Sequence, residues 1–250
     1  MTARLMIAGA LLAALVVAGC GGDDGGDAGA GASGSLPRGS EPVDLNPDEF
    51  TTKIDNPYWP MTPGNRWVYR ESEGGSELRV VVTVTERTKT IANGIEARVV
   101  HDVVSENGAP IEVTDDWYAQ DSDGNIWYLG EDTAEYENGK VVSRSGSFEA
   151  GVDGAQPGIA MPGDPQAGSS YRQEYLAGEA EDFAEVLSTD AKVKVRYGSF
   201  DGALKTKDVN PLEKPKPVEH KFYAEGVGPV LAETVAGGSG VEELVSFTEG

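Results

Sequence analysis

Cysteine and histidine are almost absent from this sequence, with one cysteine and two histidines among 250 residues. One cysteine cannot form an internal disulfide bond, and zinc sites built from cysteine and histidine need more ligands than the chain contains. Basic residues are also few, because 20 Lys and Arg stand against 42 Asp and Glu, and the formal net charge is −22. Nucleic acids and anionic bilayer surfaces both repel such a chain. We therefore expect no nucleic-acid partner.

A hydrophobic run long enough to cross a membrane is also missing. Residues 5–18 form an apolar stretch of 14 residues, whereas a spanning helix needs about 20. The stretch follows Arg4 and ends at Cys20 in the sequence Val-Ala-Gly-Cys, which is typical of a signal peptide. This ending resembles the lipobox of bacterial lipoproteins. The alternative is a plain secretory peptide with a chance cysteine.

The lipobox resemblance implies cleavage before Cys20 and attachment of a diacylglycerol group to its thiol. We then expect an extracytoplasmic protein that is anchored to the membrane of the bacterial cell envelope through this lipid. Residues 1–19 would be the signal peptide. Residues 20–40, rich in Gly, Ala, Ser and Asp, have the composition of a disordered tether. Residues 41–250 remain for a single, monomeric domain.

The domain shows the period of two that is typical of β-strands. Leu78, Val80, Val82 and Val84 occupy every second position, and Asn-Gly pairs at 93–94, 107–108 and 138–139 are strong hairpin signals. The pattern predicts a mainly β fold, a single antiparallel meander curled into a barrel, half-barrel or sandwich, with at most one short helix. Residues 179–187 fit either that helix or a strand.

One long segment, residues 149–169, has no clear period. Loops of more than about 12–15 residues are uncommon in compact domains and often serve as lids or binding loops. Its apolar residues Ile159 and Met161 indicate that it packs down onto the domain. It is interpreted either as a loop that plugs one end of a barrel or as a lid over a ligand cavity.

Catalytic motifs are scarce. The chain has no Gly-x-Ser-x-Gly elbow. His101 and His220 lie in predicted strands, and neither has a second His or Cys at ligand spacing. Carboxylate pairs of the kind used in glycoside hydrolysis will occur by chance among 42 acidic residues. We therefore expect a protein that is not an enzyme, with a carboxylate-based hydrolase as the distant alternative.

A candidate calcium site is formed by Asp121, Asp123 and Asn125, which carry oxygen at alternate positions. An EF-hand loop needs Gly at position 6 and Glu at position 12, where this chain has Ile126 and Asp132. The same residues also favour a tight hairpin turn. The turn is the favoured interpretation, so no cofactor is expected, and calcium is kept as the alternative.

Aromatic side chains suggest an apolar binding surface. Trp-Tyr pairs flank one predicted hairpin, so each pair places an aromatic on both faces of the sheet. Cross-strand aromatic pairs stabilise sheets by roughly 0.2–1 kcal/mol, which explains them as core, but aromatics also line cavities for apolar ligands. The candidate ligand-binding residues are Trp59, Trp67, Trp117, Tyr118, Trp127, Tyr128, Ile159 and Met161.

Several motifs resemble a broad family of bacterial secreted proteins. The segment Asn56–Tyr69 resembles the opening of that family, and Val195–Leu204 and Phe222–Val230 look like later parts of it. Residues 116–121 and 150–155 are similar to a narrower subgroup, so the resemblance covers nearly all of residues 50–248. The family has no established activity. The resemblance implies a curved antiparallel β structure, similar to lipoprotein carriers with half-barrel folds such as mycobacterial lipid-binding lipoproteins and LolA-like chaperones.

Two hypotheses of function follow. The first is a membrane-anchored binding module for a lipid or another small apolar or amphipathic ligand, with residues 149–169 as its lid. The second is a structural or interaction protein of the cell surface, whose acidic exterior binds proteins or divalent cations. A cavity lined by Trp and Tyr would favour the first hypothesis, and a filled interior would favour the second.

Overall fold

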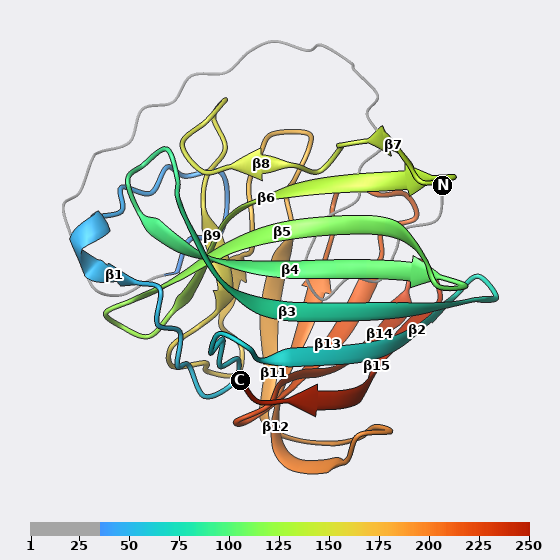
Figure 1. Cartoon of the computed structure of the whole chain (residues 1–250). Helices are drawn as coiled ribbons and strands as arrows, with labels where there is room; N and C mark the ends of the chain where they lie inside the picture. Colours follow the sequence, from blue (N-terminus) through green and yellow to red (C-terminus); the bar gives the residue numbers. More distant parts are fainter. Residues whose placement is uncertain (1–35) are drawn as a thin grey trace.

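The computed structural model describes residues 36–250, which form one large antiparallel β-sheet (Figure 1). No α-helix occurs in this part of the chain, and its one helical turn is the 3-10 helix η1, Pro47–Glu49. The strands are β1 Phe50–Thr51, β2 Arg66–Glu73, β3 Ser76–Thr90, β4 Glu96–Glu106, β5 Ala109–Asp121, β6 Ile126–Glu137, β7 Lys140–Ser143, β8 Phe148–Glu149, β9 Gly158–Met161, β10 Ser170–Arg172, β11 Phe183–Lys194, β12 Ser199–Val209, β13 Val218–Ala224, β14 Gly228–Ala236 and β15 Gly240–Thr248. The mainly β prediction is confirmed.

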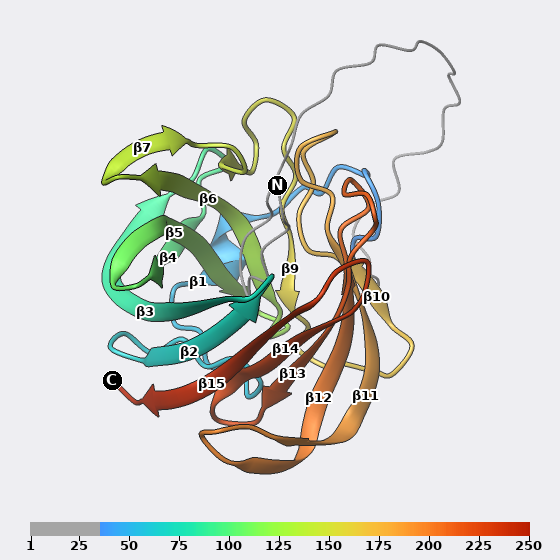
Figure 2. The same ribbon diagram turned by 90° about the vertical axis from the view of Figure 1, so that its right-hand side faces the viewer.

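The sheet consists of two meanders, β2 to β7 and β10 to β15, which are joined where the last strand, β15, pairs with β2. Its strand order is β10-β11-β12-β13-β14-β15-β2-β3-β4-β5-β6-β7. The last strand therefore pairs with β2, with Leu244 opposite Tyr69 and Glu242 opposite Glu71. Figure 2 shows β2 to β6 curving into one wall and β11 to β15 into the other. The sheet curls without closing, since no ladder joins β10 to β7 among the described residues.

The alternation of apolar residues decides which face of the sheet is inside. Leu78, Val80, Val82 and Val84 of β3 are buried, while the residues between them are half-buried or exposed. Residues 183–187, left open between helix and strand, begin β11. Within the described residues no helix is long and apolar enough to span a membrane.

The segment at 149–169 is not a loop throughout. It contains β9, whose four residues are all buried and which pairs with β6, placing Ile159 opposite Trp127 and Met161 opposite Ile126. A strand that is buried on both faces has no alternation of polar and apolar residues, so its sequence carries no period. Gly158 starts this strand where a side chain would collide with the backbone of Gln173. The middle of the segment, residues 155–162, is thus packed into the body of the protein, while residues 151–154 and 166–168 are exposed.

The predicted signal peptide at 1–19, the lipid attachment at Cys20 and most of the tether at 20–40 lie outside the described residues. The described chain starts at Leu36, which packs against the core. The backbone oxygen of Pro37 accepts a hydrogen bond of 2.7 Å from the Arg172 amide. The end of the predicted tether is therefore attached to the sheet.

Candidate functional site

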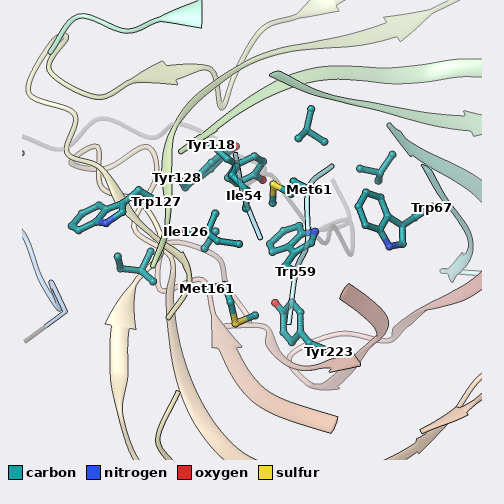
Figure 3. Packing of buried hydrophobic residues seen from close by; sticks show 14 of the residues in the cluster. Ile54, Trp59, Met61, Trp67, Tyr118, Ile126, Trp127, Tyr128, Met161 and Tyr223 are labelled. Carbon is teal, nitrogen blue, oxygen red and sulfur yellow. The ribbon is translucent and has the colours of Figure 1, made fainter. Parts of the chain in front are cut away.

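An aromatic cluster fills one part of the space inside the curled sheet (Figure 3). The ring of Trp59 lies 5.6 Å from that of Tyr118 and 6.0 Å from that of Tyr223, and Tyr118 stacks on Tyr128 at 5.0 Å. All four side chains are buried, and Met161 of β9 is fully buried among the same core residues. Because β5, β6, β13 and the loop before β2 each supply a residue, the cluster joins the two walls.

Two of the predicted binding residues lie on the other face of the sheet. The ring of Trp117 is covered by Lys89, whose Nζ is 3.3 Å from the ring centroid. Trp127 points away from the cluster (Figure 3) and donates a 2.7 Å hydrogen bond from Nε1 to Asp121. Strand alternation separates Trp117 from Tyr118 and Trp127 from Tyr128. The structure therefore does not bring the eight candidate residues together at one surface.

The third tryptophan of the sheet, Trp67, faces inward from β2 and is buried. It stacks on Phe247 with a centroid distance of 5.2 Å, and its Nε1 donates to the backbone oxygen of Val227 at 2.7 Å. Trp67 thus closes the core where β15 returns to β2. Ile159 is buried on β9 opposite Trp127.

The candidate calcium residues form a turn. Asp121 Oδ1 accepts hydrogen bonds from the backbone amides of Asp123 at 3.0 Å and Asn125 at 2.8 Å, while its Oδ2 accepts from the Asn125 side chain and from Trp127. Asn125 in turn accepts from the amide of Gly163 at 2.8 Å. In the part of the chain that the structure describes, no three His, Cys, Asp or Glu side chains are arranged to hold a metal ion. The oxygens of Asp121 are already occupied by nitrogen donors.

A second lining of the interior, which the sequence interpretation missed, is acidic. Carboxylates on five strands face inward beside the apolar residues, and each of these residues is at most 5% exposed. Register places Glu242 opposite Glu71 and Asp116 opposite Glu131. We call this set the acidic lining; its members are Glu71, Asp102, Glu112, Asp116, Glu131 and Glu242.

Tyr128 connects the acidic lining to the aromatic cluster. Its hydroxyl lies 2.8 Å from Asp116 Oδ1 and 2.7 Å from Glu131 Oε2. A phenol has one hydrogen and donates to only one of these oxygens, so one of the two carboxyl groups must carry a proton and donate in return. Burial raises the pKa of Asp116 to about 7, against the opposing effect of the Tyr128 hydrogen bond. Burial, followed by the charges of Asp116 and Glu174, raises the pKa of Glu131 well above its usual range.

Several oxygens of the acidic lining are buried without a hydrogen-bond partner. They include Asp102 Oδ1, Asp116 Oδ2, Glu131 Oε1 and Glu242 Oε1. Burial and the neighbouring charges of Glu71 and Asp102 raise the pKa of Glu242 well above normal. Buried polar atoms in proteins nearly always have a partner, because leaving one unpaired costs free energy. The lining is therefore suited to a partner that brings N–H donors or positive charge.

One buried cation faces the interior from the opposite wall. Lys221 of β13 lies with its Nζ 3.1 Å from Asp208 and 4.0 Å from Glu219. Burial lowers the pKa of Lys221, but the carboxylates of Asp208 and Glu219 outweigh this effect and raise it overall. Lys221 is therefore charged, and its ion pairs are with Asp208 and Glu219 of its own wall and not with the acidic lining.

The outer face carries a hollow of about 440 Å³ around Trp117. Its charged groups are mutually paired. Arg87 binds Asp115 through two hydrogen bonds of 2.7 Å, His101 Nδ1 lies 2.7 Å from the same carboxylate, and Lys89 pairs with Glu149 at 2.7 Å. Burial alone would raise the pKa of Asp115, and the hydrogen bonds with His101 and Arg87 lower it strongly instead. These contacts support the sheet from outside.

The buried carboxyl groups predict that the folded protein is more stable at pH 5 than at pH 8. Asp116, Asp182 and Glu219 each have a pKa of about 7, chiefly because of burial, whereas such groups titrate near 4 in an unfolded chain. The folded state thus binds more protons between about pH 4 and 7, and stability is lost as pH rises through that window. Thermal unfolding at constant ionic strength should show a Tm several degrees lower at pH 8. A Tm that rises from pH 5 to pH 8 would contradict this assignment.

Two solved structures resemble the fold of this chain. A presumed exported protein of Bacteroides fragilis with a YmcC-like fold has a TM-score of 0.47 and 14% sequence identity, over 78% of this chain and 100% of that one. A presumed lipoprotein of Parabacteroides distasonis has a TM-score of 0.40 and 13% identity, over 76% of this chain and 98% of that one. No protein-family model and no curated protein matches the sequence. The family resemblance of Asn56–Tyr69 therefore stays a prediction.

Proposed function

We propose that this protein is a lipid-anchored extracytoplasmic binding protein that holds an amphipathic ligand on the inner face of its curled sheet. The observation that carries the proposal is that one inner face presents both an aromatic cluster and buried carboxylate oxygens without partners. An amphipathic ligand has an apolar part that can pack against the aromatic cluster and a polar part that can bind the carboxylate oxygens.

The rings of the aromatic cluster are buried and in contact with one another, so the ligand would enter by parting them, and its apolar part would then lie against them. The rings of Trp59, Tyr118 and Tyr223 converge from both walls, with centroid distances of 5.6 and 6.0 Å. Ligand sites in proteins are lined mainly by such side chains, with a few polar groups that fix the orientation of the ligand. Here Tyr128 lies at the boundary between the apolar and the polar part of the site, because its ring stacks on Tyr118 and its hydroxyl contacts Asp116.

Carriage rather than catalysis agrees with the chemistry of the remaining side chains. His101 is held on the outer face by Asp115, and His220 Nδ1 lies 3.8 Å from Glu233. Cys20, the single cysteine, is expected to carry the lipid anchor. The predicted tether before Leu36 is about 16 residues long, so the body would lie at a root-mean-square distance of roughly 22 Å from its anchor, near the membrane where amphipathic molecules are collected or delivered.

Removing the ligand is expected to destabilise the protein. A ligand that binds only the folded state increases the free energy of unfolding by an amount set by the ratio of ligand concentration to Kd. It would also donate hydrogen bonds to the unpaired oxygens of the acidic lining. The chain from Gly21 onward, which keeps every described strand, would be purified gently and compared with the same protein refolded after solvent extraction. The extracted protein should have a Tm several degrees lower, restored by adding back the extract. An unchanged Tm in both steps would argue against bound ligand.

A further inference from the structure

We propose that the polar part of this ligand is a cationic amine, which donates hydrogen bonds to the acidic lining beside Tyr128. This inference rests on the proposed function, because it assigns the chemistry of the same ligand. It makes the preferred ligand class an alkylamine or a lipid with a free ammonium group, rather than a fatty acid or a neutral lipid.

The first argument is the arrangement of Asp116 and Glu131. One oxygen of each lies within 2.8 Å of the Tyr128 hydroxyl, while the other oxygen, Asp116 Oδ2 or Glu131 Oε1, is buried with no hydrogen-bond partner. The two residues are directly opposite each other on β5 and β6. An ammonium group has three N–H donors, enough to satisfy both free oxygens at once.

The second argument comes from Glu242. Its side chain is 1% exposed, its Oε1 has no hydrogen-bond partner, and it faces Glu71 across the β15–β2 pair. The internal cation, Lys221, is not directly paired with Glu242. Lys221 lies two strands away in the same register row, with Ala232 between, which is about 10 Å at the usual strand spacing. Lys221 instead pairs with Asp208 at 3.1 Å.

The third argument separates an organic amine from a metal ion. A metal ion needs several carboxylates that converge on one point, and no such group of three occurs in residues 36–250. The acidic lining is instead spread over β15, β2, β4, β5 and β6, about 24 Å along the curl at the usual strand spacing. An ammonium group needs no set of three converging carboxylates, so it fits the pair of Asp116 and Glu131 better than a metal ion does.

Tyr128 fixes where the two parts of the ligand meet. Its ring stacks on Tyr118, which contacts Trp59, and its hydroxyl lies between Asp116 and Glu131. An ammonium at the carboxyl pair therefore has its alkyl chain directed along the aromatic rings. A carboxylate headgroup in the same place would bring no N–H donor to the unpaired oxygens.

The test compares three probes with the same tail: dodecylamine, dodecanol and dodecanoate. Each is titrated at pH 7.5 into the ligand-free chain from Gly21 onward, the two ionic probes below their micelle concentrations and dodecanol below its solubility limit. Dodecylamine should bind at least tenfold more tightly than the other two. In the double variant Asp116→Asn, Glu131→Gln this preference should disappear while dodecanol affinity is unchanged. Glu225→Gln, an exposed residue of the turn after β13, is the matched control and should keep the preference.

The outcomes separate the two proposals. Equal binding of all three probes, or a preference for dodecanoate, would overturn the amine assignment and leave the proposed function standing. No binding of any probe would overturn both. The comparison of probes on the unaltered chain is decisive even if the double variant does not fold. Glu131→Gln alone offers a single replacement that should weaken amine binding and leave dodecanol binding unchanged.

Discussion

Replacing Gly130 with alanine is expected to lower the free energy of unfolding by about 3–5 kcal/mol, the range of a severe core substitution. Gly130 lies in β6 with φ of +136°, a conformation that side chains rarely adopt. A Cβ atom there would collide with the backbone oxygen of Phe148 and would stand 2.9 Å from Glu149 Cα and 3.0 Å from the ring of Trp117. Neither the β8 backbone nor the covered indole can move away cheaply.

The measurement is urea unfolding of the two proteins, with the midpoints compared at equal slope. Gly139→Ala is the matched control, because Gly139 also has a positive φ of +73° but nothing within 4 Å of its Cβ position. The control should lose about 1–2 kcal/mol, from backbone conformation alone. Equal losses at both positions would show that the contact between β6 and β8 is not as tight as described.

Replacing Lys221 with methionine is expected to cost about 3–5 kcal/mol at pH 8, the usual effect of removing one partner from a buried ion pair. Methionine keeps the length and packing of the side chain but leaves Asp208 and Glu219 without their cation. At pH 5 the loss should be smaller, because Glu219 and Asp182, each with a pKa of about 7, are protonated in the folded protein and need no counter-ion.

The control is Lys192→Met, since Lys192 pairs with Asp201 at 3.0 Å on the surface, with both side chains about 80% exposed. Exposed ion pairs contribute little to stability, so the Lys192→Met variant should have the same free energy of unfolding as the unaltered protein at either pH. A Lys221→Met protein that is as stable at pH 8 as the parent would mean that the carboxyl groups around Lys221 are neutral there. The electrostatic description of this wall would then be wrong.

The strands could be predicted because apolar residues recur at every second position where one face is buried. Leu78 to Val84 on β3 is the clearest case. The pairing of β15 with β2 could not be predicted, because it joins residues about 170 positions apart, such as Leu244 and Tyr69, and no local pattern encodes that register. The sequence therefore left barrel, half-barrel and sandwich open.

The sequence does contain a pattern that places carboxylates inside the sheet. Trp67, Tyr69 and Glu71 occupy alternate positions of one strand, so the inward orientation of the two aromatic rings also places Glu71 inside. Asp102 stands in the same relation to Val100 and Val104. The expectation that charged residues lie outside obscured this alternation, and only the assembled sheet shows that the carboxylates of different strands share one face.

The aromatic candidates lie on two different faces of the sheet, which the sequence alone could not assign to the interior or the exterior. Alternation predicts that Trp117 and Tyr118 face opposite sides, but it does not say which side is the interior. The structure places Tyr118 and Tyr128 on the inner face and both neighbouring tryptophans on the outer face, where they are also buried. The turn at Asp121 was predictable, because Asp, Gly and Asn form such turns from local hydrogen bonds alone.

The most direct test of the central claim, that the curled sheet holds an amphipathic ligand, is native mass spectrometry of the chain from Gly21 onward after gentle purification from a bacterial host. The account predicts one molecule of lipid-like mass per chain, which survives purification and is lost on solvent extraction together with the excess thermal stability. A bare protein mass before extraction, with no adduct formed when dodecylamine, dodecanol or dodecanoate is added, would contradict it.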